Sequence, residues 1–145
     1  SDSANADAVQ LYFPSASGRM LVPVTRTVYS DADVNTAMLE LCKGPKKDSG
    51  LTAPLPQGCG VRGVTMKNGI VTVDFSKEFL EAVSGDEGLQ AVRAVLFTAR
   101  QFPGVKQVNI TVEGSPYTLP EATVSTFINQ AQEVMTYYPG VIEID

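Results

Sequence analysis

The strongest pattern in the chain is a pair of short apolar runs joined by Asn68-Gly69. A type I′ turn requires positive φ at both central residues, and Asn-Gly is the dipeptide that adopts it most readily. A two-residue turn places Lys67 opposite Ile70, which predicts a hairpin over 60–75 with one apolar face. A shift of one residue would turn that face to solvent, so the register is strongly specified. The predicted face consists of Val64, Met66, Val71, Val73 and Phe75.

Two other stretches repeat apolar residues at the three- and four-residue spacing of an amphipathic helix. The first, 34–43, follows Asp31 and Asp33, either of which can cap it, and ends at Gly44-Pro45. The apolar stripe of this helix consists of Val34, Ala37, Met38, Leu41 and Cys42. The second helix, 86–102, is longer. Its predicted buried face consists of Leu89, Val92, Val95, Leu96, Ala99 and Phe102.

Three further runs have the composition of strands, at 9–13, 20–29 and 105–113. Pro23 cannot donate to a sheet ladder, so its strand is expected at an edge or a bulge. The order predicts an α+β fold with a mixed β-sheet and both helices packed on one face. Its core would be α-β-β-α-β, preceded by two short strands. The predicted core residues are Val71, Val73, Phe75, Val92, Leu96, Val108 and Ile110, with Met38 and Leu41 packing on the same sheet.

Size and charge narrow the class of protein. A chain of 145 residues with 43% hydrophobic content fits one compact domain. The net charge of −5 argues against nucleic acid as a partner, because Lys and Arg supply most of that affinity. No apolar run approaches the roughly 18 residues of a membrane span. The polar stretch 1–8 is interpreted as a linker, and we expect an export signal or membrane anchor to precede it in the natural protein.

The residue types that are missing exclude many reactions. The chain has no His, so it lacks an imidazole base, a Ser-His or Cys-His nucleophile and a His-ligated zinc. Two Cys cannot complete a structural zinc site, and no nucleotide-binding glycine motif is present. We therefore expect no catalytic residue, no cofactor and no metal.

One acidic stretch imitates a metal site. Asp31-Ala-Asp33-Val-Asn35 matches the opening of a calcium loop, but the next position is Thr36 rather than Gly, and the twelfth is Cys42 rather than Glu. Helix capping explains these acids better than calcium.

Two polar groups support an alternative function. Asp74 and Glu78, with Glu81 nearby, could form the carboxylate pair of a weak hydrolase, although acids at a strand end and in a first helical turn are also ordinary structural features. The polar side of the last strand could bind a cell-wall saccharide, although a solvated sheet face is the commoner explanation. The residues on that side are Gln107, Asn109 and Thr111.

Cys42 and Cys59 lie at a predicted helix end and strand start, on either side of one loop. A disulfide between them would close 59 − 42 + 1 = 18 residues and stabilise the fold by about 3 kcal/mol on chain entropy. The alternative is two small buried apolar side chains, which free Cys resembles. The sequence leaves both open.

Several modest motifs in a fixed order resemble the GerMN domain, named for a sporulation and spore-germination protein. The motifs are Leu11-Tyr-Phe-Pro14, Leu21-Val-Pro-Val24, Leu41-x-x-Gly44-Pro45, Leu55-Pro-x-Gly58, Asn68-Gly69-x-Val-x-Val-Asp-Phe-Ser76 with Glu78-Phe79, and Thr98-x-x-Gln101-Phe-Pro-Gly-Val105 with Val108 and Glu113-Gly114. The resemblance covers 9–128 and leaves a tail, 129–145, which we expect to form a helix and a strand packed on the same domain. The two cysteines depart from the family pattern.

The resemblance implies a non-enzymatic domain outside the cytoplasm, behind a lipoprotein signal or a single membrane anchor. It also implies a role in the cell envelope, with a core similar to a ring-building motif that packs side by side into oligomers. Envelope proteins or further copies of the domain are the expected partners, and the membrane is contacted only through the anchor.

The expected interface is the polar side of the second helix together with an edge strand at 20–29. The helix residues are Gln90, Arg93 and Arg100. Because the chain is acidic and lacks Trp, a strong isolated interface is not expected, and the domain should be a monomer in dilute solution. Tethering to a membrane would raise the effective concentration enough for assembly.

Overall fold

The computed structural model describes residues 6–82, 86–119, 122–123, 125–127, 136–137 and 142–143. Their elements are β1 (Asp7–Pro14), β2 (Met20–Val28), α1 (Val34–Lys43), β3 (Val61–Lys67), β4 (Ile70–Phe75), the 3₁₀ turn η2 (Lys77–Glu81), α2 (Asp86–Arg100) and β5 (Gln107–Val112). Short strands follow: β6 (Ser115–Pro116), β7 (Thr118–Leu119), β8 (Ala122–Thr123), β9 (Ser125–Phe127), β10 (Thr136–Tyr137) and β11 (Ile142–Glu143).

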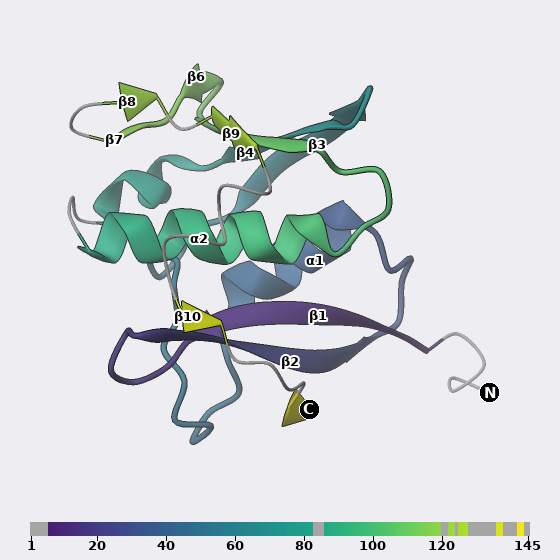
Figure 1. The fold of residues 1–145 in the computed structure, drawn as a ribbon, viewed down its shortest axis with the longest axis vertical. Coiled ribbons are helices and arrows are strands. Elements are labelled where there is room, and N and C mark those ends of the chain that lie inside the picture. The colour runs from purple at the N-terminus through teal and green to yellow at the C-terminus, as the bar shows by residue number, and fades with distance from the viewer. Residues whose placement is uncertain are drawn as a thin grey trace.

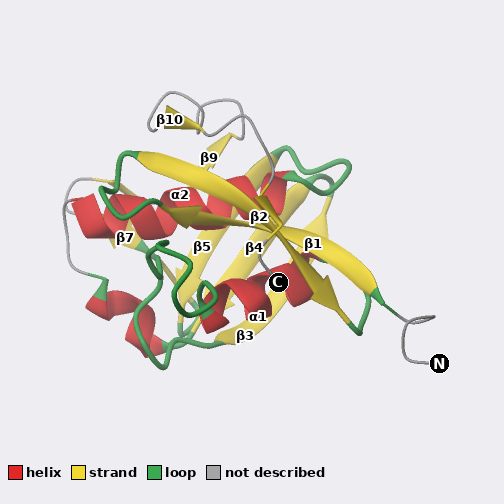
Figure 2. Cartoon of the chain, turned by 90° about the horizontal axis from the view of Figure 1, so that it is seen from below, coloured by secondary structure: helices red, strands yellow, loops and turns green. Residues whose placement is uncertain are grey.

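Both helices lie between two sheets (Figure 1). One sheet has the order β3-β4-β5-β6, with β9 also pairing β5, and the helices cover one face of it as predicted. The other sheet is β1-β2 with β10 and β11 along β2. In Figure 2, β1 and β2 lie in front of the helices, and β4 and β5 lie behind them. The two leading strands, predicted to be short, are 8 and 9 residues long and form a second layer.

The hairpin has the predicted register from Lys67 opposite Ile70 back to Gly63 opposite Asp74, and a bulge between Val61 and Gly63 then shifts it so that Val61 faces Phe75. Asn68 and Gly69 have φ of 53° and 79°, as a type I′ turn requires. The apolar face is only partly buried, however. β4 contributes fully buried side chains, whereas Met66 on β3 is 47% exposed. β3 is the edge strand of its sheet, so its apolar side chains extend beyond the surface that the helices cover.

The core lies between the sheets and contains every predicted residue. Val71, Val73, Phe75, Val92, Leu96, Val108 and Ile110 are all buried, as are Met38 and Leu41. β4 and β5 pair in parallel with Val73 opposite Ile110, and α2 makes the crossover between them. Phe75 stacks on Phe79 with ring centroids 4.7 Å apart, which extends the core under η2.

α2 is buried on more sides than its single predicted stripe. Ala91, Ala94, Phe97 and Thr98 are buried too, because a second sheet covers the side that the pattern left polar. Two side chains at the carboxyl end of α2, Thr98 and Gln101, form hydrogen bonds to that second sheet. Thr98 Oγ1 accepts a hydrogen bond from the Tyr12 N–H at 3.2 Å, and Gln101 both donates to Gln10 O and accepts from Gln10 N–H. These hydrogen bonds satisfy backbone groups on the edge of β1 that faces away from β2.

β2 is not the edge strand that its proline predicts. It pairs antiparallel with β1 and, on its other side, parallel with β10 and β11. Pro23 lies opposite Tyr12, in the gap between the residues that β10 and β11 pair. A missing N–H is tolerated at that gap, which explains how the strand keeps its proline. The predicted helix of the tail lies outside the described residues, and the predicted linker ends early because β1 begins at Asp7.

Candidate functional site

A cleft of about 270 Å³ opens between the loop after α1, the end of η2 and the start of α2. Its lining residues are Thr52, Ala53, Pro54, Leu55, Pro56, Glu81, Ala82 and Gln90. Two prolines stiffen one wall, and the polar groups are a carboxylate, an amide and a hydroxyl. None of these lining residues is aromatic, so the cleft lacks the stacking surface that would hold a sugar ring.

The three residues predicted for an interface occupy α2 but are all half-buried. Gln90 lines the cleft and lies against Gly18 in the turn between β1 and β2. The Arg100 guanidinium lies 4.0 Å from the centroid of the Phe97 ring, an attractive cation–π geometry. The structure therefore gives Gln90 and Arg100 contacts within the domain.

Asp74 is a structural carboxylate. It accepts hydrogen bonds from Thr111 Oγ1 at 2.6 Å and from the Gly114 N–H at 2.9 Å, and it pairs with Arg62 at 3.4 Å. Burial opposes its ionisation, but the bonds from Thr111 and Gly114 and the charge of Arg62 together lower the pKa of Asp74. These bonds hold the turn at Glu113, whose φ is 50°. The carboxylate is fully used in joining β4 to the end of β5.

Glu78 and Glu81, the other acids considered for a carboxylate pair, have surroundings of their own. The Ser76 hydroxyl donates to the exposed Glu78 carboxylate and lowers the pKa of Glu78. Glu81 lies in the wall of the cleft.

Asp74→Asn should lower the free energy of unfolding by about 1–2 kcal/mol at pH 7, because a hydrogen bond to a charged acceptor stabilises the fold more than a hydrogen bond to a neutral one. The pKa of Asp74 is lowered in the fold, so its contribution is present above the unfolded value near 3.8 and is lost as the pH falls through the folded value. Urea unfolding at pH 7 and pH 2.5 measures this. The gap between wild type and variant should be smaller at the lower pH. Glu81→Gln, at an acid in the wall of the cleft, is the control and should leave the free energy of unfolding close to that of the wild type at pH 7. An equal gap at both pH values would contradict the account.

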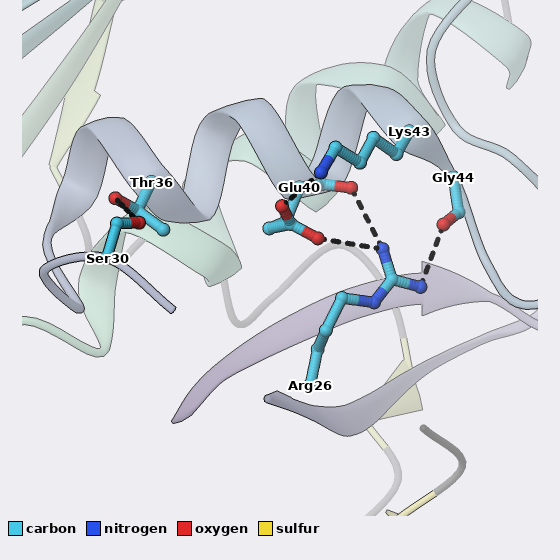
Figure 3. Close-up of polar contacts among 6 residues, drawn as sticks. All are labelled: Arg26, Ser30, Thr36, Glu40, Lys43 and Gly44. Carbon is cyan, nitrogen blue, oxygen red and sulfur yellow. Dashed lines mark hydrogen bonds and ion pairs between the residues drawn. The ribbon is translucent and has the colours of Figure 1, made fainter. Parts of the chain in front are cut away.

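Arg26 is a buried cation that the sequence interpretation missed. It is 9% exposed and donates to the carbonyl oxygens of Glu40 at 3.2 Å and Gly44 at 2.9 Å (Figure 3). It also forms an ion pair with the Glu40 carboxylate at 3.6 Å, which Lys43 contacts from the solvent side at 2.7 Å. The signal was present, because Arg26 alternates with Val24 and Val28 on the buried side of its strand. The guanidinium fastens the carboxyl end of α1 to β2.

One acid of the calcium-like stretch caps the first turn of α1. The Asp33 carboxylate accepts from the Thr36 N–H at 2.9 Å, and Thr36 also contacts Ser30 at 3.4 Å (Figure 3). Asp33 is thus the helix cap, as one of the two sequence alternatives predicted. Among the described residues there is no group of three or more Cys, Asp or Glu side chains placed to hold a metal.

Cys42 and Cys59 are brought together at the base of the loop that they flank. Both are free thiols; Cys42 is half-buried and Cys59 is buried. The hydrogen bond that Cys42 gives to Cys59, together with burial, raises the pKa of Cys42. The same bond lowers the pKa of Cys59 against the effect of burial, with help from Ser76. Each thiol therefore shifts the pKa of the other, in opposite directions.

Comparison with known proteins identifies the family of this chain. The family model for "Sporulation and spore germination", called Germane, matches residues 10–118. The chain belongs to this family. Within the described residues, no helix is long and apolar enough to cross a membrane.

One curated protein and two solved structures illustrate the match. The spore germination protein GerM of Bacillus subtilis strain 168 is 29% identical in an alignment of 123 residues, and the match covers 79% of this chain and 31% of GerM. The tandem GerMN domains of B. subtilis GerM superpose with a TM-score of 0.73 at 24% identity, covering 88% of this chain and 46% of that one. A Clostridium perfringens protein classed as a candidate lipoprotein gives 0.58 at 19%, covering 88% and 89%. The chain thus spans less than a third of the curated relative.

Proposed function

We propose that this chain is a non-enzymatic assembly module of the bacterial cell envelope, acting outside the cytoplasm and tethered near a membrane. Membership of the sporulation and spore germination family carries this proposal, since the family model covers most of the chain. The C. perfringens relative, classed as a candidate lipoprotein, supports a membrane tether. Nothing in the module needs to react with a substrate for this function.

The polar groups support interaction over catalysis. Asp74, Arg26 and Thr98 are each occupied by bonds that join strands to strands or helices to sheets. The cleft beside η2 has prolines where a saccharide binder would place aromatic rings. The alternative of a wall-saccharide module or weak hydrolase therefore has little to act with among the described side chains.

The open edge of β3 is the surface we assign to association. Among the described residues β3 pairs only with β4. Lys67 and Ile70 close the type I′ turn as a hydrogen-bonded pair, so the backbone groups of Val64 and Met66 point away from β4. Met66 and Ile70 leave apolar surface beside this edge, at 47% and 39% exposure.

The same edge carries features that keep strand pairing weak. A bulge interrupts β3 between Val61 and Gly63, and Arg62 and Lys67 place positive charges along it. Charges and bulges on edge strands oppose uncontrolled pairing. Two copies should therefore remain apart in dilute solution and associate when a membrane holds them close together. The occupant we propose is a second copy of this domain.

Diffusion on a supported bilayer tests the proposal. The domain is held on nickel-chelating lipids by an amino-terminal histidine tag with a fluorophore on the tag, and its diffusion coefficient is measured as surface density rises. We expect slowing with density for the wild type, none for Met66→Lys, and slowing retained for Leu80→Lys, a matched change at an apolar residue that is 62% exposed. Sedimentation of the untethered protein should show a monomer.

Other outcomes are equally informative. Slowing that survives Met66→Lys but is lost in Arg93→Glu/Arg100→Glu would move the interface to α2. The absence of slowing at every density would remove the assembly function. Retention of the protein on purified cell-wall saccharide would establish the alternative instead.

A further inference from the structure

The loop between α1 and β3 has a free thiol at each end. Cys42 lies one residue before the end of α1, and Cys59 lies just before β3. The two side chains lie near enough for each thiol to shift the pKa of the other. The Cys59 N–H donates to Pro56 O at 3.1 Å, and the neighbouring Gly60 N–H donates to Ser76 Oγ at 2.9 Å, so the backbone at this end is fixed.

We propose that Cys42 and Cys59 are a modification site, oxidised in the folded protein to an intramolecular disulfide by a thiol–disulfide oxidoreductase. The chain needs little movement for this, because folding has already placed the two thiols side by side. For its oxidant the reaction rests on the proposed location outside the cytoplasm, where disulfides persist. The pairing itself does not depend on that location.

The exchange balances with one disulfide as oxidant. A thiolate of the pair attacks one sulfur of the oxidant's disulfide, and the other sulfur leaves as a thiolate that takes up the proton released. The second cysteine then loses its proton and attacks the mixed disulfide, expelling the remaining thiolate, which is protonated in turn. Two electrons pass from the cysteines to the oxidant, which ends as two thiols. The hydrogen bond between the thiols lowers the pKa of Cys59 and thereby helps to supply the first thiolate.

The bond would act on the wall of the cleft. The loop that it closes carries five lining residues: Thr52, Ala53, Pro54, Leu55 and Pro56. The loop is otherwise attached to the first sheet by the Thr52 N–H bond to Pro14 O at 2.9 Å and by a bridge between Leu51 and Ser15. Oxidation would add a covalent tie at its base and restrict the motion of that wall.

Oxidation of the purified, folded protein by oxidised glutathione tests the pairing. We expect a monomer that loses its two thiol hydrogens, carries no glutathione and resists alkylation after denaturation. Trypsin without reductant should release residues 27–43 joined to residues 48–62, because trypsin cleaves after Lys43 and after Lys47, between the two cysteines. Glutathione adducts on both cysteines, two free thiols or a linked dimer would overturn the proposal.

Stability gives a second readout that needs no chemical mapping. For an 18-residue loop, the oxidised protein should melt roughly 6–12 °C above the reduced protein. In Cys42→Ala/Cys59→Ala the melting temperature should not respond to reductant, which controls for effects of the reductant itself. If mass spectrometry verifies the disulfide but the oxidised and reduced proteins melt at the same temperature, the proposed restraint on the loop is contradicted.

Alkylation of the full-length protein in intact cells separates this proposal from the proposed function. Protected cysteines support both. Free cysteines in cells, together with complete pairing by glutathione in vitro, would support the site and contradict the oxidising location. Cysteines that fail to pair in vitro contradict the site, whatever the location of the protein.

Discussion

Phe75→Ala should lower the free energy of unfolding by about 3–5 kcal/mol, the range for removing a large aromatic side chain from a filled core. Phe75 is fully buried at the end of β4 and stacks on Phe79, whose ring meets Tyr117 edge-on at 4.8 Å. Truncation leaves a cavity beneath η2 and removes the first ring of this series. Chemical denaturation monitored by circular dichroism measures the change.

Met66→Ala is the matched control, because the sequence pattern places Met66 on the same apolar face as Phe75. The structure leaves Met66 47% exposed, so its truncation should cost no more than about 0.5 kcal/mol. Similar costs for the two variants would mean that β3 is covered like β4. A cost below about 1 kcal/mol for Phe75→Ala would contradict its place in the core.

Local signals predicted most of the fold. Asn68-Gly69 determined both the turn and the register, because a type I′ turn tolerates few other residues. Asp33 and Gly44 marked the ends of α1, since both satisfy backbone groups that the helix itself leaves open. These features depend on neighbours in the sequence, so the sequence alone is enough to recognise them.

Features that depend on contacts distant in sequence were not predicted. The covering of α2 by β1 buries Ala94 and Thr98, although neither belongs to the apolar stripe facing β4 and β5. The pairing of β2 with β10 and β11 was likewise invisible in a strand that contains Pro23. A helix with a sheet on each side needs two stripes, and small residues such as Ala give a weak hydrophobic signal for the second.

The candidate site was predicted in part. A disulfide between Cys42 and Cys59 was one of two open alternatives; both are free thiols in the structure and shift each other's pKa, so the disulfide stays a prediction. Arg26 was overlooked because a cation inside an apolar strand looks like an exception to the pattern, whereas its stem packs among apolar side chains and its head meets helix carbonyls. The carbonyls that receive it belong to the last turn of α1, which strand alternation cannot reveal.

Arg26→Met should lower the free energy of unfolding by about 3 kcal/mol, more than any other single polar change in the described core. Methionine replaces the apolar stem but cannot donate to Glu40 O or Gly44 O, and it leaves the Glu40 carboxylate without its inner cation. Removing one partner of a buried ion pair is costly because the other partner stays desolvated. Chemical denaturation at pH 7 measures the loss.

Two further variants separate charge pairing from carbonyl capping. Glu40→Gln should cost only about 1 kcal/mol, because Arg26 keeps both carbonyl acceptors and its place 5.8 Å from the Phe13 ring centroid. Arg26→Met/Glu40→Leu should recover part of the loss of Arg26→Met, because an apolar pair has no desolvated charge. If Glu40→Gln proved as costly as Arg26→Met, the ion pair rather than the capped helix end would hold α1 on β2. If Arg26→Met were neutral, neither interaction would matter to the joint between the helix and the sheet.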